Sequence, residues 1–216
     1  MPTPKFDAPD YIGINGVGRH QLLHPHFEAW QRYFTTEYQA PRDRIAVFLP
    51  CAAIKPYPAS PIHKIINRYL EPYQQCIHRI VISNAGIIPY EFSHEYPFDS
   101  YDWNPAYETP EIINEYVKVT HRRLTSYLSR HPYKGYVSYL RWDSASYGAL
   151  KCSMDNLNLP LHAVKVEGRL PRKDPDLLLT LPGNLGGLGC ILGRLTGAKP
   201  LNTRGAKYDN KGGDTL

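Results

Sequence analysis

The sequence predicts an α/β protein, built as a three-layer α/β/α sandwich with a mainly parallel central sheet. The first observation is that apolar runs of strand length recur along the chain, at residues 44–49, 79–83, 135–140 and 161–166. The second is that longer segments with helical spacing separate these runs. Strands that alternate with helices pair in parallel through right-handed crossovers, which places helices on both faces of the sheet.

The first part of the chain contains one helix, one strand and a second helix. Residues 1–20 are rich in Pro, Gly and Asp and predict irregular structure, whereas residues 26–39 have helical spacing. After the strand at 44–49, Ser60 followed by Pro61 is an N-cap and first-turn signal. The helix that begins there places five apolar side chains on one face: Ile62, Ile65, Ile66, Tyr69 and Leu70.

The second part continues this alternation. The strand at 79–83 ends at Asn84-Ala85-Gly86, and a loop rich in Tyr, Pro and Asp covers residues 94–108. Thr109-Pro110 begins the longest predicted helix, roughly 110–130, and a shorter helix around 144–157 separates the last two strands. The long helix is expected to bury a stripe formed by Ile113, Tyr116, Val117, Leu124 and Tyr127.

The composition changes after Pro182, which divides the chain into two parts. Residues 1–181 are expected to form one α/β catalytic domain, since a chain of 216 residues is long enough for a single well-buried core. Residues 182–216 are rich in Gly and basic, and they predict a loosely ordered tail. Such a tail can hold a phosphate backbone, or it is simply a solvated terminus.

Composition and charge narrow the function classes. The formal net charge of +5 and the 17 tyrosines tolerate a nucleic-acid partner without requiring one. No apolar run reaches the roughly 18 residues of a membrane span, so we expect no membrane partner and a cytoplasmic location. None of the four cysteines forms a C-x-x-C pair, which argues against a zinc ribbon, and we expect neither a metal nor a cofactor.

The most informative stretch is the loop at residues 50–63, which follows the first strand. It carries Cys51, Lys55, Tyr57, Ser60 and His63 within thirteen residues. Ligands of open α/β sheets bind beyond the carboxyl ends of the strands, so this loop has the layout of an active site. It favours a planar, polar or anionic substrate near a helix N-terminus, although the spacing alone names no reaction.

The side chains in the loop can have a functional role or a purely structural one. Cys51 is a nucleophile if its pKa is lowered by Lys55, His63 or the helix terminus, or else a small buried hydrophobe. Lys55 is an anion anchor, nucleophile or stabiliser, or else a solvated lysine. His63 is a general acid or base, and Ser60 fits an N-cap better than a catalytic role.

The loop resembles the signature of archaeosine synthases, which reads Pro-Cys, three residues, Lys-Pro-Tyr, two residues, Ser, two residues, His. Every fixed position and spacing matches, from Pro50-Cys51 to His63. A second resemblance follows at the next strand end, where Gly86, Pro89 and Glu91 match a Gly-x-x-Pro-x-Glu turn of that family. The resemblance covers about residues 44–103.

This resemblance implies a fold similar to uracil-DNA glycosylases and a tRNA-modifying transferase activity. Archaeosine synthases add an amine donor, lysine or glutamine, to the nitrile of 7-cyano-7-deazaguanine in tRNA, and a radical-SAM partner then completes the amidine. The resemblance assigns catalysis to Cys51, Lys55 and His63, which act through a thioimidate on Cys51 or by polarising the nitrile. Substrate binding falls to a second set: Tyr57, Ser60, Asn84, Gly86 and Glu91, the last of which is expected to hold the donor amine.

One departure from the family leaves alternatives open. Archaeosine synthases also carry a transglycosylase-like domain and an RNA-binding domain, so we expect a short stand-alone form that works with a separate RNA-binding subunit or on another substrate. One alternative is a glycosylase or hydrolase that acts on a modified base, although the loop offers no Asp to activate water. Another is a non-catalytic nucleic-acid-binding accessory subunit.

Overall fold

The computed structural model describes residues 3–7, 14–168 and 174–198, and its centre is a five-stranded sheet of order β3-β2-β1-β4-β5. Three of the four strand pairings are parallel, and only β3 runs antiparallel to its neighbour β2. The strand bounds are β1 (Ile45–Pro50), β2 (Ile77–Ser83), β3 (Gly86–Pro89), β4 (Gly135–Ser138) and β5 (His162–Ala163).

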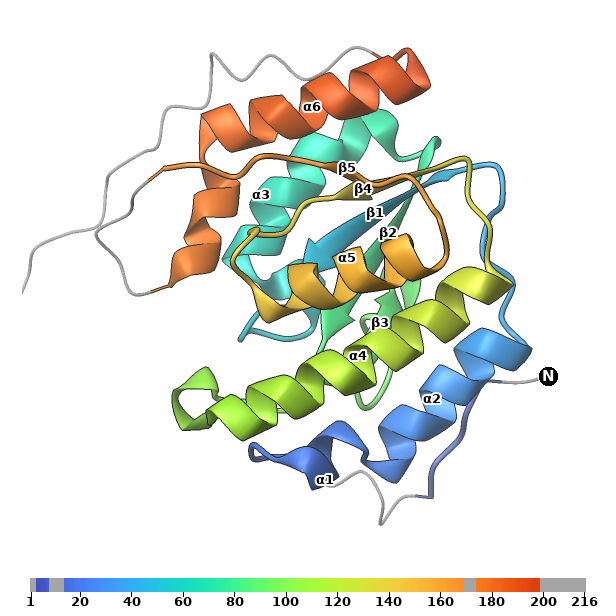
Figure 1. Cartoon of the computed structure of the whole chain (residues 1–216), viewed down its shortest axis with the longest axis vertical. Helices are drawn as coiled ribbons and strands as arrows, with labels where there is room; N and C mark the ends of the chain where they lie inside the picture. Colours follow the sequence, from blue (N-terminus) through green and yellow to red (C-terminus); the bar gives the residue numbers. More distant parts are fainter. Residues whose placement is uncertain (1–2, 8–13, 169–173, 199–216) are drawn as a thin grey trace, which may run out of the picture.

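Helices cover both faces of the sheet, as Figure 1 shows. One face carries α3 (Pro61–Leu70) and α6 (Pro182–Thr196), and the other carries α2 (Pro25–Thr36), α4 (Pro110–Arg130) and α5 (Ala145–Asn156). A short α1 (Arg19–Leu22) contacts α4. Short 3₁₀ helices complete the chain: η2 (Tyr57–Ala59), η3 (Glu71–Tyr73), η4 (Tyr90–Phe92), η5 (Pro105–Tyr107) and η6 (Pro175–Thr180). The expectation of a mostly parallel sheet flanked by helices is confirmed.

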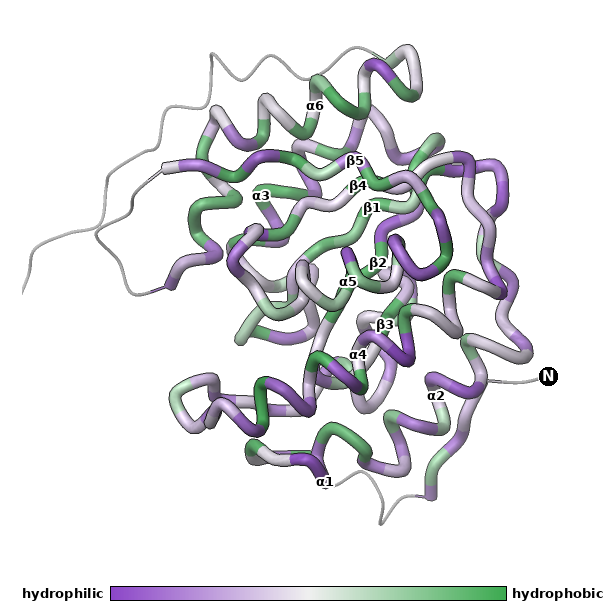
Figure 2. The backbone as a smooth tube through the Cα atoms, viewed as in Figure 1, coloured by the Kyte–Doolittle hydropathy of each residue, from purple (hydrophilic) through white to green (hydrophobic). Residues whose placement is uncertain are grey.

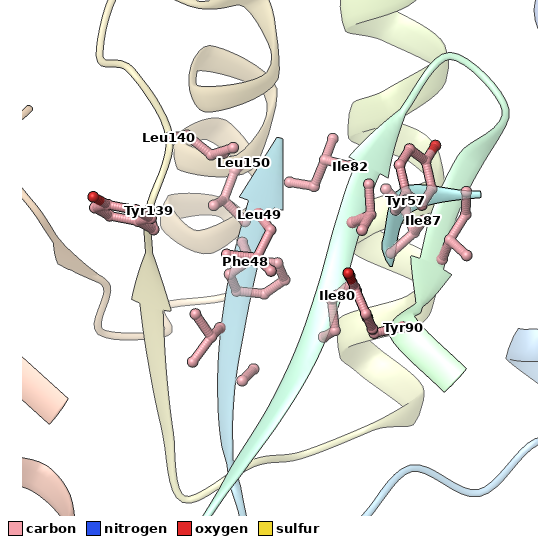
Figure 3. Packing of buried hydrophobic residues seen from close by; sticks show 14 of the residues in the cluster. Phe48, Leu49, Tyr57, Ile80, Ile82, Ile87, Tyr90, Tyr139, Leu140 and Leu150 are labelled. Atoms are coloured by element: carbon pink, nitrogen blue, oxygen red, sulfur yellow. The ribbon is translucent and has the colours of Figure 1, made fainter. Parts of the chain in front are cut away.

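Strand β1 lies at the centre of the core because both of its faces are covered. All six of its residues are buried, which is why the strand is a continuous apolar run rather than an alternating one. Figure 3 shows Phe48 and Leu49 between Tyr139 on the β4 side and Ile80 on β2. In Figure 2, β1 runs through the middle of the molecule as an apolar segment, whereas α4 alternates between polar and apolar residues.

Helices α2 and α4 begin where the sequence predicts. In α2 the ring of His24 accepts a hydrogen bond from the His26 backbone N–H, and Pro25 occupies the first turn. In α4 the Thr109 hydroxyl accepts from the Ile112 backbone N–H, which is an N-cap bond. Helix α4 ends at Arg130, so its predicted bounds are confirmed.

The predicted buried stripe of α4 is partly wrong. Ile113 is 38% exposed, whereas Arg123 is 4% exposed. The Arg123 guanidinium is buried because it donates to Glu28 at 2.7 Å and to the Leu22 carbonyl oxygen at 2.6 Å. A buried cation with such partners is tolerated, so Arg123 can face inward from α4. A prediction from hydrophobic periodicity places arginine on the solvent-exposed face of a helix, so it does not identify Arg123 as a buried residue.

Strand β3 was not predicted, and its turn explains why Gly86 is required. Gly86 has φ +135°, a conformation that side chains rarely adopt, and a Cβ there would lie 2.3 Å from Nε2 of Gln31. The Gln31 side chain occupies this space because its Oε1 accepts from the Ile87 backbone N–H at 3.0 Å. The turn therefore joins β2, β3 and α2.

Two expectations about the C-terminal part of the chain are corrected. The run at 161–166 forms only a two-residue strand, β5. Residues 182–196, expected to be a loosely ordered tail, form helix α6, and Leu185, Leu188 and Leu192 belong to the core. The remaining tail, 199–216, lies outside the described residues. No helix in the described part of the chain is both long and apolar enough to cross a membrane.

Candidate active site

The loop after β1 lies at the point where the direction of the sheet's connections reverses. From β1 the chain passes through α3, on one face, to β2 on one side of β1. It later passes through α4, on the other face, to β4 on the opposite side of β1. Such a switch point leaves a crevice beyond the carboxyl ends of the two strands, which is where α/β sheets bind ligands.

Cys51 and Lys55 come together at this switch point. Both are part-buried, and each influences the ionisation of the other. Burial raises the pKa of the Cys51 thiol to about 11, although the positive charge of Lys55 acts in the opposite direction. Burial likewise lowers the pKa of Lys55, against the effect of Cys51 and Asp102. At neutral pH the pair is a thiol beside an amine that gives up its proton more readily than usual.

An aromatic cluster lies beneath this pair. The Lys55 ammonium lies 3.9 Å from the centre of the Tyr101 ring, a cation–π contact. The Tyr101 hydroxyl is 2.8 Å from the hydroxyl of Tyr57, which is fully buried. Burial raises the pKa of both phenols, so they are neutral hydrogen-bonding groups.

Two carboxyl groups that the sequence did not single out act on Cys51. Glu108 and Asp176 both raise the pKa of the thiol through their charge. Glu108 accepts from the indole N–H of Trp103 at 2.6 Å, and Asp176 accepts from Arg141 at 2.7 Å. The sequence could have pointed to Arg141 as a site residue, because it comes shortly after strand β4. It could not have pointed to Glu108 and Asp176, because they lie in the loop before α4 and in η6 and follow no strand.

His63 lies behind the loop rather than in it. Its ring is fully buried, and its Nε2 lies 2.9 Å from the carbonyl oxygen of Pro50, the last residue of β1. The ring stands between those of Tyr57 and Tyr90. Burial lowers the pKa of His63 to about 4, so the imidazole is neutral and donates from Nε2. The expected general acid at this position therefore has neither the charge nor the exposure for that role.

The remaining predicted residues near the loop are buried structural groups. Ser60 occupies the N-cap position of α3, but its side chain makes no capping hydrogen bond. Asn84 is 9% exposed, and its carbonyl oxygen accepts from Arg123. Gly86 lies against Gln31, as described above. Asn84 and Gly86 follow β2, so they share the carboxyl edge of the sheet with Cys51.

Glu91 is separated from all of these residues. Because β3 runs antiparallel to β2, the chain has returned to the amino edge of the sheet when it reaches Glu91. The Glu91 carboxylate contacts Nε2 of His78 at 3.1 Å and accepts from the Tyr38 hydroxyl. His78 precedes Ser83 by five strand residues, or about 16 Å. Glu91 therefore does not face Cys51, and the expected donor-binding role at this position is not supported.

No metal ligand set is visible in the described residues. Within 3–7, 14–168 and 174–198, no group of three or more His, Cys, Asp or Glu side chains is arranged to hold a metal ion. All four cysteines are free thiols.

Comparisons with known proteins add a family and two named relatives. A model of a family described as a domain of unknown function, DUF5591, matches residues 27–166. The chain is 28% identical over 140 residues to the archaeosine synthase subunit alpha of Thermoplasma acidophilum and 33% identical over 110 residues to that of Methanosarcina acetivorans. These matches cover 62% and 50% of this chain but 25% and 17% of the relatives. The chain thus spans about a quarter or less of their length.

A solved structure resembles the fold. The crystal structure of AF0587, a protein of unknown function, matches with a TM-score of 0.53 and 16% sequence identity. The match covers 75% of this chain and 48% of that one. At this identity the likeness concerns the arrangement of the sheet and helices alone.

Proposed function

Since this chain belongs to the DUF5591 family, we propose that it modifies tRNA during archaeosine formation, adding the amine of lysine or glutamine to the nitrile of 7-cyano-7-deazaguanine. The two similar proteins are named archaeosine synthase subunit alpha, which supports the reaction class. The observation that carries the proposal is the Cys51–Lys55 pair at the β1/β4 switch point.

The Cys51–Lys55 pair provides a nucleophile and a proton relay for attack on a nitrile. Cys51 Sγ forms a bond to the nitrile carbon, and the thiol proton passes to the nitrile nitrogen with the Lys55 amine as relay. The product is a thioimidate, C(=NH)–S. The raised pKa of the thiol is compatible with this step because the proton is transferred as the bond forms, so no free thiolate has to accumulate.

Release from Cys51 completes the addition. The donor amine attacks the thioimidate carbon, the C–S bond breaks, and the sulfur takes up a proton from the donor nitrogen. An amine has then been added across the nitrile to give an amidine, with the thiol regenerated and no oxidant or reductant consumed. In a direct route, the Lys55 ammonium instead polarises the nitrile nitrogen while the donor attacks without a covalent step.

Other residues in and around the loop have supporting roles in this proposal. Tyr57 and Tyr101 are buried beneath the pair, and the Tyr101 ring holds the Lys55 ammonium in place. His63 is a positioning residue, since it fixes the start of the loop through Pro50. We further propose that a single α/β domain that includes α6 acts as the catalytic unit, with a uracil-DNA-glycosylase-like sheet, and that a separate RNA-binding or radical-SAM subunit assists.

The proposal is tested by nucleoside mass spectrometry. The full chain is incubated with tRNA that contains 7-cyano-7-deazaguanine, together with lysine or glutamine, and the nucleosides are analysed for the mass of the added amine. The Cys51→Ser and Lys55→Met variants are expected to lose about a hundredfold or more of the rate, whereas Cys152→Ser, which changes an exposed thiol, keeps it.

Each other outcome has a defined meaning. Normal turnover by Cys51→Ser would eliminate the covalent route and leave the direct one. Unchanged activity in both loop variants would show that the reaction depends on neither Cys51 nor Lys55 and would overturn their proposed roles. No mass gain with the unaltered protein and either donor would overturn the proposed reaction.

A further inference from the structure

Trp142 is an exposed tryptophan at the carboxyl edge of the sheet. Of the three tryptophans, all of which lie in the described residues, Trp30 and Trp103 are 1% and 7% exposed, whereas Trp142 is 49% exposed. Tryptophan is normally highly buried because its ring contributes a large apolar area. A half-exposed indole beside a candidate active site therefore needs a functional explanation.

The exposed ring is held in place on two sides. The indole Nε1–H donates to the carbonyl oxygen of Val164, directly after β5, at 3.0 Å. The ring lies nearly parallel to that of Tyr147 in α5, at 14° with 6.1 Å between ring centres, so the two rings are offset. The indole is thus fixed in orientation while part of its face stays open to solvent, and a partner would not have to order it.

The ring belongs to the edge that carries the candidate active site. β4 pairs in parallel with β1, and the Tyr139 backbone N–H donates to the Phe48 carbonyl oxygen at 3.0 Å, so the segments that follow the two strands leave the sheet side by side. Arg141, which precedes Trp142, bonds Asp176, and the charge of Asp176 acts on Cys51. The segment that carries the indole thus leaves the same edge of the sheet as the segment that carries Cys51.

We propose that Trp142 is a stacking platform for an unpaired nucleobase of the RNA, next to the nucleotide that reacts at Cys51. The choice of RNA rests on the proposed function. A planar, preoriented indole is the group that proteins use to stack single-stranded bases, and a target base must be unstacked from its neighbours before an enzyme can reach it.

The charges around Trp142 favour stacking over phosphate contact. Asp143 is paired with Arg141, and Glu167 is paired with Lys165, so acidic and basic side chains offset each other beside the indole. A site that worked mainly by binding phosphates would present unpaired cations instead. The contribution of Trp142 should therefore depend on the base and not on the backbone charge.

The test is a binding experiment with unmodified RNA, which needs no reaction. The full chain is titrated with a single-stranded oligoribonucleotide and with an abasic oligomer of equal length and charge. Trp142→Leu is expected to weaken binding of the first by about 5- to 100-fold and to leave binding of the second unchanged. Trp142→Phe should retain part of the affinity, and Leu195→Ala, an exposed apolar residue on α6, should retain all of it.

Salt dependence and fluorescence provide further readouts. Trp142→Leu should shift the plot of log affinity against log salt without changing its slope, because no phosphate contact is lost. Base-containing RNA should quench the protein's tryptophan fluorescence through its one exposed indole.

The outcomes separate this inference from the proposed function. Equal RNA affinities of the unaltered protein and Trp142→Leu would overturn the stacking role, as expected if the indole seats a protein partner instead. Equal weakening for both oligomers would also overturn it. A failed nitrile reaction of the unaltered protein with intact Trp142-dependent binding would reject the reaction while supporting the platform.

Discussion

The imidazole of His63 donates from Nε2 to the carbonyl oxygen of Pro50, over 2.9 Å, and thereby ties the first turn of α3 to the end of β1. The loop that carries Cys51 and Lys55 is closed by this bond at its base. His63 thus fixes one end of the loop, while Cys51 and Lys55 lie part-buried within it.

This buried histidine predicts a specific pH dependence of stability. Burial lowers the pKa of His63 to about 4, whereas an unfolded histidine has a pKa of about 6.5. Between pH 4 and 6.5 this residue binds more protons in the unfolded chain than in the folded one. The stabilisation that His63 contributes is therefore complete above about pH 6.5 and is lost as the pH falls towards 4. The loss from this one group amounts to as much as about 3 kcal/mol.

Denaturant unfolding at several pH values checks this. His63→Gln keeps an N–H donor without the titration, and it should flatten the stability curve between pH 4 and 6.5. His94→Gln, which changes an exposed histidine, should leave the curve as it is. If His63→Gln and the unaltered protein show the same slope, His63 is not the group responsible.

The Cys51 thiol should react as an unusually weak acid. Because burial raises its pKa to about 11, its alkylation by iodoacetamide should still be accelerating at pH 9 to 10, where an ordinary thiol has levelled off. Lys55→Met removes the charge that lowers this pKa and should move the midpoint higher still. Mass spectrometry of the Cys51 peptide follows the reaction, with Cys152 as an internal reference; a midpoint near pH 8 contradicts the assignment.

Gly86→Ala should destabilise the protein by more than about 2 kcal/mol. The change places a Cβ at φ +135° and brings it 2.3 Å from the Gln31 amide. Gly148→Ala is the matched control, because a Cβ there meets nothing within 4 Å and the residue lies inside α5. That variant should gain about 0.5–1 kcal/mol. Thermal unfolding of both variants decides the comparison, and equal effects would mean that the turn at Gly86 is not strained by a side chain.

Helix α6 should contribute to global stability. Leu188 is fully buried, so Leu188→Ala is expected to cost about 2–5 kcal/mol. Leu195, on the same helix, is 37% exposed, and Leu195→Ala should change stability by less than about 0.5 kcal/mol. Urea unfolding measures both. Similar small effects would show that residues 182–196 do not pack as α6.

Glu91 should matter for stability and not for the reaction at Cys51. Burial raises the pKa of its carboxyl group, but the hydrogen bond and charge of His78 and the hydrogen bond of Tyr38 outweigh burial and lower it overall. The resulting stabilisation is present above the unfolded pKa and is lost as the pH falls through the folded pKa. Glu91→Gln should cost about 1 kcal/mol near neutral pH. A loss of donor binding with unchanged stability would reverse this assignment.

The local elements could be predicted because their signals are short-range. Thr109-Pro110 marks the start of α4 through a cap and a first-turn proline, and the apolar run 45–49 can only be buried in the interior of a sheet. The spacing from Cys51 to His63 identifies the loop and, through its position after β1, the edge of the sheet where chemistry is expected. Strand β3 escaped prediction because a run of four residues carries little signal beside a turn.

By itself the sequence determined four of the five strands, the helices α2 to α5, the motif of the loop at 50–63 and its family, since caps, periodicity and motif spacing depend on near neighbours along the chain. Only the tertiary structure decided which of these residues meet. The antiparallel return of β3 carries Glu91 away from Cys51, burial keeps the His63 imidazole neutral, and Glu108 and Asp176 act on the thiol through their charge from distant segments. Burial and charge at a given atom depend on packing between segments far apart in the chain, and no spacing along one segment encodes that.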